Sequence, residues 1–196
     1  MAYFPTRDFL VEVARGKITG QSIVRRVGIN PDIDSAGEED AWFAGGNMNW
    51  QTSAQVLEAV STDADDVSVT GTGARTIKVW GLNSSYAEVN QTVTMLGTTA
   101  VALTTNLVYV DRIEILTTGS SETNEGDISV QILAGGAVLA RTPANFGQAF
   151  HASYFVPTGK TGYIIGWTSS LYKAVSGSAE MRLMIAEDGV GWRVVG

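Results

Sequence analysis

The stretch that decides the fold is Arg75-Thr-Ile-Lys-Val-Trp-Gly-Leu82. Its apolar Ile77 and Val79 fall on one face of an extended chain, because successive strand side chains point to opposite faces. Thr76, Lys78 and Trp80 fall on the other face. One apolar face and one mixed face are typical of a strand that covers a core from one side. We therefore predict a strand over residues 75–82.

The same alternation recurs along the chain, most clearly at Val108–Ile115 and Asp127–Leu133. Glycine-rich turns such as Gly71-Thr-Gly73 and Gly135-Gly136 separate the runs. Many short strands with such turns predict an all-β chain, folded as an antiparallel, jelly-roll-like β-sandwich. A short helix is predicted at Ser53–Val60. The remaining strand predictions are Phe9–Ala14, Ser22–Ile29, Ala41–Ala44, Val67–Thr70, Asn90–Met95, Val138–Arg141, Ala152–Val156, Gly162–Thr168, Met181–Ala186 and Trp192–Val195.

The pattern divides the chain into an extended N-terminal arm with the first strands, residues 1–30, and a sandwich domain, residues 31–196. Within that domain, residues 31–66 form an acidic, loop-rich insertion. The last residues, Gly191–Gly196, stop within a strand-like pattern. We expect either a longer chain or a strand from a partner to complete that sheet edge.

Composition narrows the classes of function. Only 17% of residues are charged, so part of the surface is expected to be covered by neighbouring subunits. The net charge of −7 argues against nucleic-acid binding, which needs clustered Lys and Arg. No apolar run approaches the roughly 20 residues that span a membrane, and no secretory signal is evident, so we expect synthesis in a cytoplasm.

No motif indicates catalysis, a cofactor or a metal ion. The single histidine, His151, lies two residues before Ser153 in a strand-like run, which is not a recognised arrangement for a catalytic triad. Asp63, Asp65 and Asp66 could supply oxygen ligands to calcium, but they lack the Gly and Glu of an EF-hand loop. A solvated acidic turn explains them better. We predict that the protein is not an enzyme.

Exposed aromatic side chains leave one binding function open. Sugar sites use the faces of Trp and Tyr beside Asn, Asp and Gln, and the candidates here are Trp42, Trp50 and Tyr86, with Trp80 as a further strand residue. Aromatic residues more often pack against their own core. A glycan-binding or receptor-binding module is therefore the alternative function.

Several of these segments together resemble a group of virion structural proteins from marine and cyanobacterial tailed phages. The resemblance lies in the opening, in the core run and in later strands, namely Gly20–Val24, Val27–Pro31, Gly71–Leu82, Glu88–Met95, Gly97–Thr99, Val108–Ile115, Tyr154–Lys160 and Met181–Leu183. It implies a β-sandwich that decorates or cements the capsid, or that forms a knob or fibre base. It supplies no functional residues.

The resemblance and the low charge density lead to one functional expectation. We expect a homo-oligomer, most simply a trimer, located in the virion and bound to the major capsid protein or to other virion proteins. The alternative location is a tail or head fibre, or a knob that binds a receptor or glycan. The arm can reach a neighbour, so the expected assembly contacts are apolar residues along it: Phe4, Phe9, Val11, Val13 and Ile23.

Overall fold

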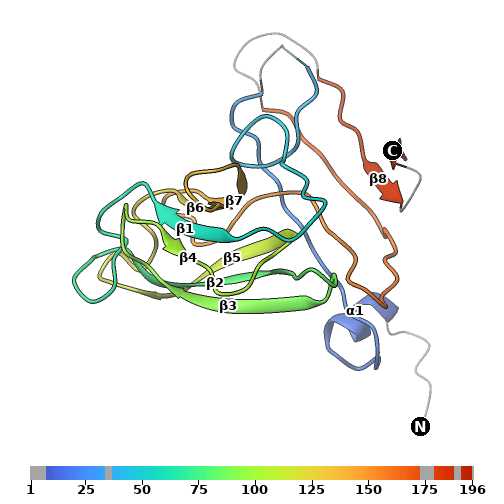
Figure 1. Ribbon diagram of the computed structural model, residues 1–196. Helices are drawn as coiled ribbons and strands as arrows, with labels where there is room; N and C mark the ends of the chain where they lie inside the picture. The colour runs from blue at the N-terminus through green and yellow to red at the C-terminus, as the bar shows by residue number, and fades with distance from the viewer. Residues whose placement is uncertain (1–7, 34–36, 173–178, 188–190, 196) are drawn as a thin grey trace. The chain divides into compact units, whose positions relative to one another are not determined.

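The computed structural model describes residues 8–33, 37–172, 179–187 and 191–195 (Figure 1). The chain forms two compact units, Met1–Gly159 and Lys160–Gly196. The described residues contain one short helix and nine strands, and every strand pair is antiparallel. The prediction of an all-β chain with antiparallel sheets is thus confirmed.

The first unit contains two sheets. The four-stranded sheet has the order β4-β1-β6-β7, and the three-stranded sheet has the order β3-β2-β5. Their bounds are β1 Leu57–Ser61, β2 Ala74–Leu82, β3 Glu88–Thr94, β4 Val101–Ala102, β5 Tyr109–Thr118, β6 Ile128–Ile132 and β7 Val138–Thr142.

The strand predicted at residues 75–82 is β2, the centre of the three-stranded sheet. Ile77 and Val79 have no exposed surface, whereas Lys78 and Trp80 are half-buried, as the alternation predicted. Trp80 lies opposite Asn90 of β3 and Arg112 of β5. This face of the sheet therefore carries a polar and aromatic surface.

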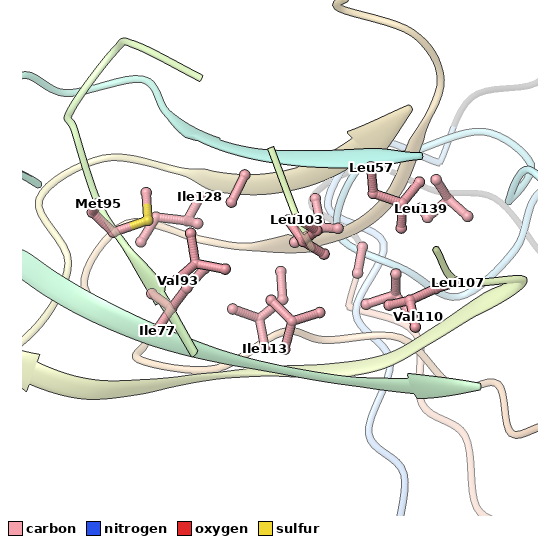
Figure 2. Packing of buried hydrophobic residues seen from close by; sticks show 14 of the residues in the cluster. Leu57, Ile77, Val93, Met95, Leu103, Leu107, Val110, Ile113, Ile128 and Leu139 are labelled. Atoms are coloured by element: carbon pink, nitrogen blue, oxygen red, sulfur yellow. The ribbon is translucent and has the colours of Figure 1, made fainter. Parts of the chain in front are cut away.

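Both sheets contribute side chains to one apolar cluster (Figure 2). Figure 2 shows these side chains between β1, in cyan, and β2, in green. Connecting segments add Met95, Leu103 and Leu107. The strand members of the cluster include Leu57, Ile128, Val130 and Leu139 from one sheet, and Ile77, Val79, Val93, Val110 and Ile113 from the other.

Two predictions assigned the wrong type of element. Residues Phe9–Ala14 form a helix, α1, because Asp8 caps it by accepting a hydrogen bond from the Leu10 amide at 2.8 Å, and Glu12 pairs with Arg15 one turn later. The helix predicted at Ser53–Val60 is absent. Leu57 and Ala59 instead point into the core from β1, whose partner is β6.

Other predicted strands are not part of a ladder. Ser22–Ile29, Ala152–Val156 and Gly162–Thr168 form no strand, while Ala41–Ala44 and Val67–Thr70 contribute one isolated bridge residue each. Alternation places side chains on two faces, but a strand also requires a neighbour that accepts and donates the main-chain hydrogen bonds.

Glycine at position 28 lets the arm approach the body closely. A Cβ atom there would overlap the carbonyl oxygen of Ala41 and stand 2.6 Å from the amide nitrogen of Ala152. Both obstacles are backbone atoms of segments that are hydrogen-bonded to each other, from the Ala152 amide to the Ala41 carbonyl at 2.9 Å. They cannot move apart without breaking that bond.

We predict that Gly28→Ala loosens the arm, because overpacking of this kind costs about 1–3 kcal/mol. Trypsin should then cut faster after Arg25 and Arg26, which lie two and three residues before Gly28. Gly37→Ala is the control, since an added Cβ at Gly37 meets nothing within 4 Å. Equal cleavage rates for the two variants would contradict the close approach.

Candidate assembly surface

The arm contacts the rest of the first unit from Arg26 onward. The Arg26 guanidinium forms an ion pair with Asp111 of β5 and lies 5.1 Å from the ring centroid of Tyr154. Asn30 then donates to Glu39 Oε2 at 2.7 Å and to the Asp40 carbonyl at 3.1 Å. Because these contacts lie between residues 26 and 30, the part of the arm that precedes them is not needed to hold them.

The assembly contacts predicted on the arm meet different environments. Phe9, Val11 and Ile23 are 55%, 50% and 43% exposed. Val13 is only 5% exposed, so its surface is already used within the chain and offers little to a partner. Phe4 lies outside the described residues. Exposed apolar side chains continue along the arm at Val24, Val27 and Ile29.

The second unit begins with a segment that sequence reasoning did not identify as an interface. Every residue from 160 to 172 is exposed, and none belongs to a helix or a strand. Its large apolar side chains are Tyr163, Ile164, Ile165, Trp167, Leu171 and Tyr172, with exposed fractions between 42% and 97%. The signal in the sequence was the run Tyr163-Ile-Ile-Gly-Trp167, which has no polar face.

A β-hairpin completes the second unit. Its strands are β8, Met184–Glu187, and β9, Gly191–Val194, with Met184 opposite Val194 and Ala186 opposite Trp192. Ahead of it, Arg182 pairs with Glu180 at 2.7 Å and lowers the pKa of that exposed carboxyl. Met184, Trp192 and Val194 are 40%, 50% and 55% exposed.

The outer face of the three-stranded sheet carries a second surface feature. The Trp80 ring lies 4.2 Å from the Lys78 ammonium and 4.5 Å from the Arg112 guanidinium, measured to its centroid, and its indole N–H donates to Glu114 at 3.2 Å. An open pocket of about 270 Å³ adjoins it. Its lining includes Trp80, Tyr154, Arg26, Asp111 and residues 23–25 of the arm. Burial raises the pKa of Tyr154 there.

The aromatic residues predicted to bind glycans do not form one exposed platform. Trp42 is 5% exposed, and its indole N–H donates to the Gly46 carbonyl at 3.0 Å. Trp50 packs against Phe155 at 5.8 Å between ring centroids. Only Tyr86 is well exposed, at 39%. Two of the three side chains therefore serve packing.

The single histidine is buried in a polar network. His151 is 3% exposed, and its Nδ1 lies 2.8 Å from Ser153 Oγ. The Tyr109 hydroxyl donates to the Ser153 carbonyl at 3.0 Å. Burial lowers the pKa of His151 to about 4 and raises that of Tyr109 well above its usual value. The pocket beside Trp80 is not lined by His151 or Ser153. The hydrogen bonds of this network tie residues 151–153 to Tyr109 of β5.

Two carboxylates hold loops together through hydrogen bonds. Asp66 has no exposed surface and accepts hydrogen bonds from the amides of Ala74, Glu125 and Gly126 and from the Ser61 hydroxyl. The interpretation of Asp66 as part of a solvated turn is therefore wrong. In the part of the chain that the structure describes, no three His, Cys, Asp or Glu side chains gather as metal ligands.

Glu58 plays a comparable part at the β6–β7 turn. The Gln131 side chain and the amides of Gly135 and Ala134 donate to its carboxylate, and they lower its pKa. The turn needs this support because Ala134 has a positive φ of 65°, which strains a residue with a side chain.

In comparisons with known proteins, no family model, no curated protein and no solved structure matches this chain. Among the described residues, no helix is long and apolar enough to cross a bilayer. We therefore infer function from the exposed surfaces of the described residues.

Proposed function

We propose that the protein is a non-enzymatic structural subunit of a tailed-phage particle. In this role it decorates or cements the capsid, it is located in the virion, and it acts as a homo-oligomer, most simply a trimer, bound to the major capsid protein or to other virion proteins. The resemblance of the sequence to phage virion proteins and its exposed apolar segments support the proposal.

One observation carries it, namely the long exposed apolar segment that opens the second unit. Between residues 160 and 172 there are six large apolar side chains, each at least 42% exposed. Burying such a side chain fully stabilises by about 1.5–3 kcal/mol, so this segment alone could contribute on the order of 5–10 kcal/mol on docking. Large exposed apolar surfaces in soluble proteins mark interaction sites.

The proposal extends to the fold. We infer that the two sheets of the first unit form a β-sandwich of jelly-roll-like type, because their side chains meet in one shared core. Such a sandwich is rigid and needs no help from the arm to bury its centre. The arm and the second unit would then remain available for neighbours on a particle surface.

We predict that deleting residues 1–20 leaves the first unit folded and lowers occupancy on the particle by at least tenfold. The anchor contacts begin at Arg26, whereas the exposed Phe9 and Val11 are removed. A tenfold loss corresponds to about 1.4 kcal/mol, less than the burial of one such side chain contributes. Occupancy is measured by quantitative electrophoresis of purified particles.

The matched control for this deletion is Leu116→Thr, which removes an apolar side chain 44% exposed on β5 and leaves the arm intact. Full occupancy of the truncated protein would mean that the arm makes no essential contact. Particles that lack the protein should also lose resistance to heat or osmotic shock, as expected for a cement.

The alternative function is a knob or fibre module that binds a receptor or glycan. The pocket beside Trp80 and Tyr154 favours it, because aromatic rings and charged side chains line one open hollow. It predicts binding on a glycan array that Tyr154→Ala abolishes. Particles without the protein would then keep their heat resistance and lose attachment to the host.

A further inference from the structure

We propose that the open pocket beside Trp80 and Tyr154, here called the arm pocket, binds one sugar unit that carries a carboxylate. The inference rests on the alternative function, the knob or fibre module. It deepens that function because it names the class of ligand and the side chain that meets each part of it. The cement proposal does not depend on it.

A β-bulge in β5 builds one side of the arm pocket. Trp80 of β2 pairs with Arg112, but the next residue, Gly81, pairs with Val110, so Asp111 is an extra residue without a partner on β2. Successive residues of a regular strand point to opposite faces, whereas Asp111 and Arg112 both line this pocket. Bulges redirect side chains in this way, and they are frequent beside functional sites.

The arm forms the other side of the pocket. The redirected Asp111 forms an ion pair with Arg26, and this contact fixes the arm beside β5. Ile23, Val24 and Arg25, which come just before that ion pair, line the pocket together with Arg26. The bulge therefore both shapes the strand side of the pocket and holds its arm side in place.

The positive charges that line the pocket favour an anion. The chain has only 13 Lys and Arg residues and a net charge of −7, yet three arginines line this one pocket. Asp111 neutralises Arg26. Within the described residues, the side chains of Arg25 and Arg112 form no ion pair and no hydrogen bond. Their N–H groups are therefore available, and a guanidinium matches a carboxylate with two parallel hydrogen bonds.

The two aromatic rings have different parts in the pocket. The Trp80 ring is already contacted by the Lys78 ammonium and the Arg112 guanidinium, at 4.2 and 4.5 Å from its centroid. Stacking on an aromatic ring pre-organises a guanidinium, so Trp80 orients Arg112. Tyr154 is 39% exposed, and its ring offers the remaining aromatic surface for the apolar face of a sugar.

Glu88 makes a sugar a better ligand than a simple anion. This carboxylate lines the pocket, is exposed and has no ion pair or hydrogen bond in the described part of the chain. An ionised carboxylate only accepts hydrogen bonds, so it fits the hydroxyl groups of a ligand. The volume of about 270 Å³ is just below the roughly 300–1,000 Å³ of pockets for drug-sized ligands, which suits a single ring.

Two matched sugars test the inference. Methyl galacturonide carries a carboxylate where methyl galactoside carries a hydroxymethyl group, and saturation-transfer NMR measures the Kd of each for the full-length chain. We expect the Kd of the galacturonide to be lower by at least about tenfold, because a hydrogen bond to a charged group is stronger than one to a neutral group.

Three variants assign the roles. Arg112→Gln should bind both sugars with about the Kd that the wild type has for the galactoside, and this retained binding shows that the variant is folded. Tyr154→Ala should weaken both sugars alike. Arg15→Gln is the matched control, because Arg15 pairs with Glu12 on α1 and does not line the pocket. It should keep the wild-type preference.

Equal Kd values of the two sugars for the wild type, no binding of either, or a full preference in Arg112→Gln would each overturn the inference. So would tighter binding of free glycine, which offers both charges without a ring. The chain that lacks residues 1–20 keeps every residue that lines the pocket, so it should keep the preference even where its occupancy on the particle falls. Failure of the sugar site and failure of the cement function are thus distinguishable.

Discussion

Replacing Asp66 by alanine should lower the free energy of unfolding by at least about 4 kcal/mol, because three backbone amides and one hydroxyl lose their acceptor at a buried site and each unsatisfied group costs about 1–3 kcal/mol. The carboxylate joins the end of β1, the start of β2 and the loop at residues 125–126. Since domains are stable by only about 5–15 kcal/mol, the variant should be close to unfolding at 25 °C.

The neighbouring Asp65→Ala is the matched control. Asp65 is exposed, and its hydrogen bonds come from its backbone amide and carbonyl, so its variant should stay within about 0.5 kcal/mol of the wild type. Asp66→Asn should fall between them, since its amide NH₂ would face one of the backbone donors. Urea unfolding followed by fluorescence measures the free energy of unfolding of all three variants. Equal stability for the two alanine variants would contradict the role of the Asp66 carboxylate as a shared acceptor.

Lowering the pH from 7 to 5 should destabilise the protein by about 2 kcal/mol through His151 alone. Its pKa is about 4 in the folded chain, against about 6.5 when unfolded, so only the unfolded chain takes up a proton in this window. Stability is therefore complete above pH 6.5, falls as the pH drops through the window and levels off near pH 4. The full effect is about 3 kcal/mol.

The loss of stability between pH 7 and 5 can be assigned to His151 because the chain has a single histidine. Glu58 has a lowered pKa, and its contribution is lost only as the pH falls below its ordinary value of about 4.5. His151→Asn keeps a polar group near Ser153 and removes the titration, so its stability should be nearly flat from pH 7 to 5. Measurements at fixed protein concentration separate this effect from assembly. A wild-type profile as flat as that of His151→Asn would contradict a buried neutral imidazole.

Local alternation was sufficient to predict the elements of the three-stranded sheet, because β2 and its partners each bury one face. It failed where other contacts decide the structure, a helix cap in one segment and a distant pairing strand in another. Val11 and Val13 alternate like strand residues, but the Asp8 cap and the Glu12–Arg15 pair favour a helix. The short helix predicted over Leu57 is a strand because β6 is available to pair with it.

Sequence alternation also predicts the candidate surface only in part. Phe9, Val11 and Ile23 are exposed, so their role as assembly contacts stays a prediction, whereas the burial of Val13 depends on how α1 packs. Asp63, Asp65 and Asp66 look alike in sequence, and only the folded chain places backbone amides around the third. The sequence of Gly162–Thr168 resembles that of a strand, but the structure has no strand there. The sequence pattern does not reveal whether a pairing strand is present.

The central claim is that the apolar surface outside the shared core associates with copies of the same chain. Sedimentation equilibrium of the purified full-length chain, at concentrations from about 1 to 50 µM, tests it most directly. We expect a mass that is a multiple, most simply three times, of the 20.8 kDa of one chain. A single 20.8 kDa species across the whole range would contradict it.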